Sequence, residues 1–344
     1  MVETHQLASG GEAVYATVNI PRGTRIVAEV PLIVVPPFKS ESEEIWALCK
    51  AVDGLADDQV DEFARIPCNP ELLKAYKEKG FVEEIAWSFY KSKKLKDKNG
   101  SLLKGKRMRK IVNKTIRICL VYVYSNVQLG PEGKHGSGIF SLYSRMRHSC
   151  IPNAYNCWNA TLGRLTIHAI HDIKAGEQIF VNYIGNVCRV RKQRALSLYH
   201  VWRITCNCVA CTDDALDQTR YRMLVLDQAL AAWDQAGDRG VGTLGADAFD
   251  SAEEALQGAE ELLSLLKKER LCGMELCRAV RDCSERAFGC CNFDKALKYA
   301  QMELKYEIAL IGTDNDHHQQ DYYGAKRWIE RMEERVKLFI SLGY

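Results

Sequence analysis

The sequence lacks two features that would place the protein in a membrane or on a secretory route. No stretch approaches the roughly 20 consecutive apolar residues that span a bilayer. The first residues also lack an apolar run with a basic flank, which a signal peptide requires. We therefore expect no membrane contact and an intracellular protein that resides in the cytoplasm or the nucleus.

The sequence also lacks a strong charge of either sign. Its 47 lysines and arginines exceed its 44 aspartates and glutamates by only three. A whole-chain field of this size does not argue for a nucleic-acid partner. Positive charge gathers locally in residues 91–114, a stretch that begins with Lys91 and ends with Lys114. Most such runs are solvated surface, and a weak contact with nucleic acid or an acidic protein stays open as the alternative.

Cysteine is well represented, with 14 residues. Without a secretion signal, reduced thiols and one metal site explain these residues better than disulfides do. Cys206, Cys208 and Cys211 follow the spacing C-x-C-x-x-C, which supplies three of the four thiolates of a tetrahedral zinc site. The alternative is a group of three unrelated buried cysteines. The adjacent residues His317 and His318 are expected in a solvated loop rather than in a metal site.

The first third of the chain changes from strand to helix periodicity. Residues 13–19 and 25–35 read as two strands, and the turn at residues 21–24 predicts that they form a β-hairpin. From residue 42 to residue 89 apolar side chains recur at three- and four-residue spacing, broken by prolines within residues 67–70. This pattern predicts a helical insert.

The remainder of the chain returns to strands and then becomes helical. Residues 111–124 form an apolar run that predicts a buried helix, and residues 138–184 have strand character. Beyond Cys211 apolar stripes recur at helical spacing to the end of the chain, which predicts packed helices. The run at residues 293–311 is similar to a helix of a tetratricopeptide array, although no clean 34-residue period repeats.

Three motifs together resemble those of a SET domain. Residues 147–153 read R-H-S-C-I-P-N, similar to the N-H-S-C-x-P-N signature. Residues 176–183 read G-E-Q-I-F-V-N-Y, similar to G-E-E-I-x-x-x-Y, and residues 206–211 resemble a post-SET cysteine motif. Residues 36–110 contain only two cysteines, so the chain resembles the SET and MYND family in the shorter form, common in fungi, that lacks the MYND finger.

The resemblance implies an α+β fold. The expected architecture is a β-rich SET core with a pseudoknot-like crossing, a helical insert, a zinc-capped post-SET segment and a C-terminal all-α domain. The expected parts are the N-terminal piece of the SET core (1–40), the helical insert with the basic loop (41–110), the SET core with the motif and the active-site tyrosine (111–205), the post-SET zinc segment (206–215) and the helical, tetratricopeptide-like domain (216–344).

The resemblance also assigns a catalytic residue and the missing metal ligand. Tyr183 corresponds to the active-site tyrosine, whose hydroxyl lies near the transferred methyl group in the family. Cys150 corresponds to the fourth ligand of a structural Zn²⁺ site. The expected metal ligands are Cys150, Cys206, Cys208 and Cys211.

For the methyl donor S-adenosylmethionine, the resemblance implies contacts from four places in the chain. They are the N-terminal G-x-G-x-x-A segment, the N-H pair, an asparagine after the middle helix and an aromatic residue before the post-SET cysteines. Residues 11–16 read G-E-A-V-Y-A. Ile204 stands where the family has the aromatic residue, and the nearby Trp202 could replace it. The expected donor-binding residues are Gly11, Ala13, Tyr15, Asn126, Arg147, His148, Tyr183 and Ile204.

Arg147 is the main departure from the family pattern, because the family has an asparagine that touches the donor at this position. A guanidinium that points inward would crowd the pocket and repel the donor's sulfonium and ammonium groups. It could instead point outward or pair with the donor's carboxylate.

The leading interpretation is an S-adenosylmethionine-dependent methyltransferase whose substrate is a protein lysine. The alternative is an enzyme that has lost methyl transfer and acts on a small apolar metabolite, for example in a cyclisation. In that alternative Arg147 polarises a carbonyl and Tyr183 acts as an acid. A third interpretation is a non-catalytic binding module whose helical tail recruits a partner.

Overall fold

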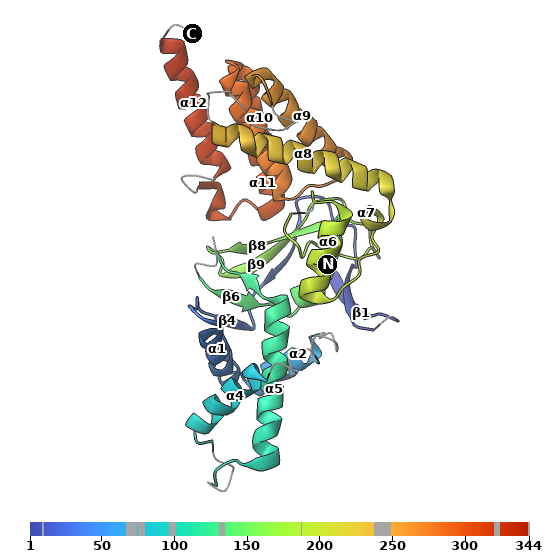
Figure 1. The fold of residues 1–344 in the computed structure, drawn as a ribbon, viewed down its shortest axis with the longest axis vertical. Coiled ribbons are helices and arrows are strands. Elements are labelled where there is room, and N and C mark those ends of the chain that lie inside the picture. The colour runs from blue at the N-terminus through green and yellow to red at the C-terminus, as the bar shows by residue number, and fades with distance from the viewer. Residues whose placement is uncertain are drawn as a thin grey trace.

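The computed structural model describes residues 1–8, 10–66, 74, 80–95, 101–130, 135–186, 188–236, 249–319 and 324–342. The molecule is elongated, with small sheets in its middle and helices at both ends (Figure 1). This mixture of helices and sheets confirms the predicted α+β class. None of the helices in the described part of the chain combines the length and apolarity that crossing a bilayer requires.

Four small sheets form the middle of the molecule, and three of the six strand pairs among the described residues join strands that are distant in sequence. This is the arrangement expected for a β-rich core assembled from separate segments of the chain. The sheets comprise β1 (Val2–Gln6) with β2 (Glu12–Ala16); β3 (Arg25–Glu29), β9 (Arg164–Ala169) and β8 (Ala154–Asn159); β4 (Ile33–Val35), β6 (Ser137–Ile139) and β5 (Val127–Gln128); and the parallel pair β7 (Arg147–His148) and β10 (Phe180–Val181).

The predicted N-terminal hairpin is wrong, although its turn forms. The N–H of Thr24 donates to the carbonyl of Pro21 at 3.2 Å, and Gly23 has a φ of +84°. The two flanking strands nevertheless pair elsewhere, β2 with β1 and β3 with β9. Most residues of β1 are polar and exposed, so no apolar alternation in the sequence indicated this strand.

The predicted insert is helical, and its helices enclose their own core. Helix α1 begins after Ser40, whose hydroxyl accepts a hydrogen bond from the N–H of Glu43 at 3.3 Å and so satisfies an N-terminal amide. Buried apolar residues of α1, α4 and α5 pack together. The predicted helix break at residues 67–70 lies outside the described residues. The insert helices are α1 (Glu41–Asp53), α2 (Asp57–Arg65), α4 (Phe81–Ser92) and α5 (Gly105–Ser125).

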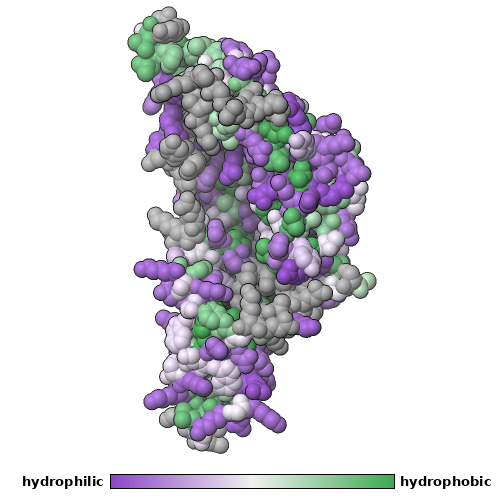
Figure 2. Space-filling model, viewed as in Figure 1, coloured by the Kyte–Doolittle hydropathy of each residue, from purple (hydrophilic) through white to green (hydrophobic). Residues whose placement is uncertain are grey.

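The basic stretch of residues 91–114 spans the end of α4 and the beginning of α5. Its residues 96–100 lie outside the described part of the chain. Lys93 forms an ion pair with Asp53 at 3.0 Å. Figure 2 shows hydrophilic and hydrophobic side chains interspersed at this end of the molecule. A contact of the stretch with nucleic acid or an acidic protein stays a prediction.

The C-terminal part is helical, as predicted. The expected apolar stripes are buried, for example Met223 and Leu226 in one cluster and Trp328 and Met332 in another. Helix α11 contacts β8 and β9, which joins the helices to the central sheets (Figure 1). The helices of this part and the short elements before it are η2 (Tyr143–Arg145), α6 (Arg191–Trp202), α7 (Val209–Thr212), α8 (Asp214–Ala236), α9 (Ala252–Lys268), α10 (Met274–Gly289), α11 (Phe293–Ile311), η4 (Asp316–Gln319) and α12 (Ala325–Ser341).

The expectation of a solvated loop at the histidine pair is wrong for His318, which is 1% exposed. Its Nδ1 lies 3.0 Å from Glu307 Oε2, and its Nε2 lies 2.6 Å from the carbonyl oxygen of Gly312. Glu307 is itself buried and also contacts His317. A buried carboxylate needs polar partners, and the two histidines supply them.

Candidate active site and metal centre

The site forms where two segments that are distant in sequence lie side by side. Strand β7 pairs in parallel with β10, as the predicted crossing requires. Asn153 fixes the arrangement, because its Nδ2 donates to the carbonyl of Gln178 at 2.8 Å and its Oδ1 accepts from the N–H of Phe180 at 2.8 Å. The last residue of the first motif therefore holds the second motif in place.

A cavity of about 1440 Å³ opens beside these segments. Two of the predicted donor-binding residues do not line it. The side chain of Ala13 is fully buried in β2, and the hydroxyl of Tyr15 donates to Oε1 of Gln178 at 3.3 Å. The predicted residues that do line the cavity are Gly11, Asn126, Arg147, His148, Tyr183 and Ile204.

Several other residues that line the cavity were not predicted from the sequence. Met146 and Asn207 lie next to recognised motif residues, so their positions in the sequence could have indicated them. Lys268 and Arg270 come from the end of α9, far along the chain, and no sequence signal connects them with the motifs. Trp202, which we considered as a substitute for Ile204, also lines the cavity.

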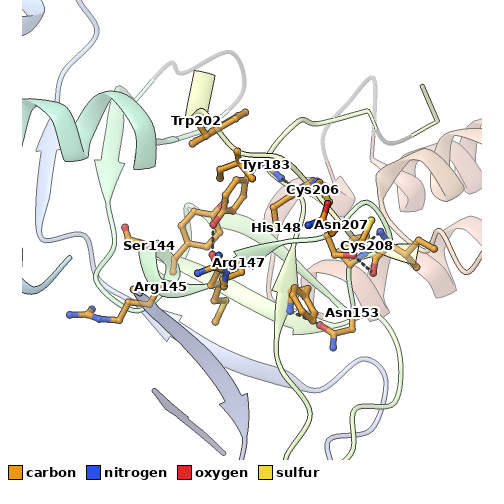
Figure 3. A pocket seen from close by; sticks show the side chains of 18 of the residues that line it. Ser144, Arg145, Arg147, His148, Asn153, Tyr183, Trp202, Cys206, Asn207 and Cys208 are labelled. Carbon is orange, nitrogen blue, oxygen red and sulfur yellow. Dashed lines mark hydrogen bonds between the residues drawn. The ribbon is translucent and has the colours of Figure 1, made fainter. Parts of the chain in front are cut away.

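Tyr183 lies among aromatic rings with its hydroxyl held in place (Figure 3). The hydroxyl donates to the carbonyl oxygen of Met146. The ring centroids of His148 and Trp202 are each 5.4 Å from that of Tyr183. Burial raises the pKa of Tyr183 to about 12, against the opposing influence of the Arg147 charge. The hydroxyl therefore keeps its proton near neutral pH.

His148 has a defined orientation and tautomer. Its Nδ1 accepts a hydrogen bond from the backbone N–H of Tyr183 at 3.1 Å. Burial lowers the pKa of His148 to about 4, so the ring is neutral near pH 7. These contacts assign its single proton to Nε2, which lies 3.3 Å from Sγ of Cys150. The imidazole thus donates toward the sulfur atom of Cys150.

Arg147 crosses the cavity wall toward the N-terminal turn. Its Nη1 lies 3.7 Å from the position that a Cβ atom would take at Gly11. In the part of the chain that the structure describes, its guanidinium makes no hydrogen bond or ion pair. Arg145, two residues earlier, differs because it is 8% exposed and pairs with Glu12 at 2.7 Å. In Figure 3 the side chain of Arg145 extends away from the site, whereas Arg147 lies beneath Tyr183.

The four predicted metal ligands form one cluster. The Sγ atoms of Cys150, Cys206, Cys208 and Cys211 all lie within 4.8 Å of one another. Sγ of Cys150 and Sγ of Cys211 are 3.6 Å apart. A tetrahedral zinc site with bonds of about 2.3 Å has sulfur–sulfur distances of about 3.8 Å. This cluster could bind a metal ion.

The four thiols of the cluster ionise unequally. Hydrogen bonds among them lower the pKa of Cys208 and lower that of Cys211 to about 6, whereas the pKa values of Cys150 and Cys206 are raised. The guanidinium of Arg194, which is fully buried, donates to Sγ of Cys211 at 3.8 Å and to the carbonyl of Ala210 at 2.6 Å. A buried positive charge beside the sulfur atoms offsets part of the negative charge of a thiolate cluster.

A buried ion pair connects the cluster with the C-terminal helices. Arg220 of α8 pairs with Glu269 at the end of α9, and both side chains are almost completely buried. The same guanidinium donates to the carbonyl oxygen of Cys150 at 3.2 Å. Arg220 of α8 therefore contacts both the end of α9 and one cysteine of the cluster.

The family model for the SET domain matches residues 11–184, which is half of the chain. The chain belongs to the SET domain family. This membership confirms the resemblance to a SET domain, and the matched region contains both paired segments of the site.

Curated relatives of this SET domain protein are named as lysine methyltransferases. It is 28% identical over 328 residues to "Histone-lysine N-methyltransferase set5" of Schizosaccharomyces pombe, a match that covers 93% of this chain and 81% of that protein. It is 38% identical over 84 residues to "Protein-lysine N-trimethyltransferase SMYD5" of Gallus gallus, covering 24% of this chain and 20% of the relative. It is 33% identical over 85 residues to "N-lysine methyltransferase SMYD2" of Homo sapiens, covering 25% and 19%.

Among solved structures, the SET domain protein aligns with "Crystal structure of the SET domain of LSMT bound to Lysine and AdoHcy". The alignment has a TM-score of 0.34 and 12% sequence identity, and it covers 97% of this chain and 87% of that chain.

Proposed function

We propose that this SET domain protein is an S-adenosylmethionine-dependent protein-lysine methyltransferase. The observation that carries the proposal is the oriented hydroxyl of Tyr183 in a large cavity whose wall includes the Gly11 turn and the R-H-S-C motif. The names of the relatives support the substrate class, since all three describe methylation of lysine and two of them name histone or protein lysine.

The N-terminal turn has room for a donor. Gly10 and Gly11 have φ values of +85° and +79°, which residues with a Cβ atom rarely adopt. A Cβ atom added at Gly10 would meet no atom within 4 Å, so there is open space beside the turn. S-adenosylmethionine supplies an electrophilic methyl group on a sulfonium. The residues that would hold it are Gly11, Asn126, Arg147, His148, Trp202 and Ile204.

In this proposal Tyr183 positions the substrate amine. Because its proton is donated to Met146, the hydroxyl oxygen retains lone pairs that can accept a hydrogen bond from an amine. The rings of His148 and Trp202 keep water away from this point. A lysine with a usual pKa of about 10.4 must be neutral to react, and desolvation favours its neutral form.

We also propose that the cysteine cluster holds a structural Zn²⁺ ion. Four thiolates complete a tetrahedral shell and leave no open position for a substrate. The ion would fasten residues 206–211 to Cys150 and so keep Ile204 and Trp202 beside Tyr183. We also propose that the chain consists of the five parts expected from its sequence, with boundaries at residues 40, 110, 205 and 215. The helical part would then add Lys268 and Arg270 to the cavity wall.

Calorimetric titration with S-adenosylmethionine, followed by transfer of a radiolabelled methyl group to lysine-containing proteins such as core histones, tests the function. We expect native protein to bind the donor and to label lysine. Tyr183→Phe should bind the donor equally well but lose roughly 10²-fold in turnover. Tyr221→Phe, at a 62% exposed position, is the matched control and should behave as native.

The same titration separates the proposal from its alternative. If native protein fails to bind the donor and an Arg147→Asn variant binds it, Arg147 closes the donor site. The methyltransferase proposal would then be abandoned in favour of chemistry on another substrate.

A further inference from the structure

We propose that Arg147 is the residue that recognises the α-carboxylate of the methyl donor. This inference rests on the proposed function, because the carboxylate is the only anionic group of S-adenosylmethionine. The position that departs from the family motif would thereby keep its contact with the donor but recognise a different group of it, the carboxylate.

The backbone of β7 directs the Arg147 side chain along the cavity. Pairing with β10 fixes the strand, and the guanidinium reaches the N-terminal turn, where Nη1 lies 3.7 Å from the Cβ position of Gly11. Both Gly11 and Arg147 line the cavity. An anion that enters between the turn and β7 would therefore meet the planar face or the edge of the guanidinium.

The charge of Arg147 is not neutralised by the protein. Among described residues no acidic side chain pairs with it, and the acids of the cavity wall are already engaged. Glu12 accepts from Gln6 at 2.8 Å and from Arg145 at 2.7 Å. Glu177 accepts from Nδ2 of Asn153 at 3.3 Å. The wall thus presents a guanidinium whose two-pronged donor geometry matches a carboxylate.

Pairing with the donor's carboxylate would also offset the repulsion between the Arg147 guanidinium and the donor's sulfonium. The positive charge of Arg147 lowers the pKa of the Tyr183 hydroxyl and so opposes the increase caused by burial. Because Arg147 lines the same cavity as Tyr183, its unpaired guanidinium would repel a sulfonium bound there. A carboxylate bound to Arg147 cancels that charge locally, so a donor that carries a carboxylate suits this cavity better than one without it.

Affinities for two ligands test the proposal. S-adenosylhomocysteine carries the carboxylate, and 5′-(3-aminopropylthio)-5′-deoxyadenosine is the same molecule without it. By calorimetry, native protein should bind the first about 10- to 100-fold more tightly, as expected for charge-assisted hydrogen bonds to one group. Arg147→Met, which keeps the length of the side chain, should reduce this preference to about threefold or less. Arg147→Lys should give an intermediate preference, because an ammonium lacks the two-pronged geometry.

Arg203→Met is the matched control. Arg203 lies beside Trp202 in sequence, stacks on the ring of Tyr199 at 4.8 Å and does not line the cavity. Its removal changes the net charge equally and should preserve the ligand preference. A thermal melt of each variant checks that it is folded.

The outcomes separate this inference from the proposed function. Equal binding of both ligands by native protein, or an unchanged preference in Arg147→Met, overturns the role of Arg147 and leaves the methyltransferase proposal standing. Binding that appears only after Arg147 is replaced also overturns it, because the residue then blocks the site. If neither ligand nor S-adenosylmethionine binds to any variant, both proposals are overturned.

Discussion

The imidazole of His148 joins Tyr183 to Cys150. The backbone N–H of Tyr183 donates to Nδ1 at 3.1 Å, and Nε2 lies 3.3 Å from Sγ of Cys150. The candidate catalytic tyrosine and the cysteine cluster are therefore coupled through one neutral ring. A change at His148 should alter the position of Tyr183 without touching its hydroxyl.

The variants His148→Leu and His148→Asn test whether the hydrogen bond between His148 and the backbone of Tyr183 matters. Leucine leaves the N–H of Tyr183 without an acceptor, which should lower the free energy of unfolding by about 1–3 kcal/mol and reduce methyl transfer. Asparagine keeps an oxygen near the position of Nδ1, so its loss of stability should be smaller. Chemical denaturation and turnover measure both effects. Equal stability of the two variants would show that the hydrogen bond to Tyr183 is unimportant.

Replacing Cys208 by serine tests the proposed Zn²⁺ site. The cluster loses one of four thiolates, and we expect zinc content by elemental analysis to fall with a loss of stability on the order of 3 kcal/mol or more. Cys291→Ser is the control, because Cys291 is exposed and lies outside the cluster. Native zinc content and an unchanged melting temperature in Cys208→Ser would contradict the ligand assignment.

The Arg220–Glu269 ion pair should contribute far more to stability than its exposed neighbour. Arg220→Met leaves the carboxylate of Glu269 buried without its charged partner, which should cost about 3–5 kcal/mol in the free energy of unfolding. On the same two helices, Arg222 pairs with Glu261 at 2.6 Å, and both side chains are more than 40% exposed. Arg222→Met should therefore cost less than about 1 kcal/mol. Similar losses in the two variants, measured by urea denaturation, would refute this assignment.

His168 should make the protein less stable in mild acid. It is 1% exposed, and burial, with the nearby charge of Arg25, lowers its pKa from 6.5 to about 4. Between these values the unfolded chain binds a proton that the folded chain does not. The contribution of His168 is therefore complete above pH 6.5 and is lost as the pH falls toward 4.

His168→Gln removes this titration and keeps an acceptor for Arg25, whose Nε lies 3.3 Å from Nε2 of His168. As the pH falls from 6.5 toward 4, native protein should lose more unfolding free energy than the variant does, by on the order of 1–3 kcal/mol over the full window. Denaturation curves from pH 7.5 to pH 5 measure the first part of this change. A difference that does not vary with pH would rule out the shifted pKa.

The sequence predicted those parts of the site that depend on local spacing. The motif around His148 and the three closely spaced cysteines were recognisable because each function needs residues that are close in sequence. The apolar stripes of the helices were recognisable for the same reason, since helix periodicity is local. Arg147 stood out as a departure only because the surrounding motif was complete.

Features that depend on which surfaces meet could not be read from the sequence. The partner of β2 is a polar, exposed strand, so apolar alternation gave no signal for it. His318 is buried because Glu307 lies beside it in the fold, and nothing in the local sequence of His318 reveals that neighbour. Lys268 reaches the cavity wall only through the packing of the C-terminal helices on the core.

The pairing of β3 with β9 has a consequence for synthesis on the ribosome. In the described sheets β3 (Arg25–Glu29) has no neighbour except β9 (Arg164–Ala169), and the whole helical insert lies between them in sequence. At usual rates of translation, on the order of ten seconds pass between the emergence of the two strands. During that interval an apolar strand edge is exposed on the nascent chain. Chaperones that bind extended apolar segments should therefore engage this protein before residue 170 has been made.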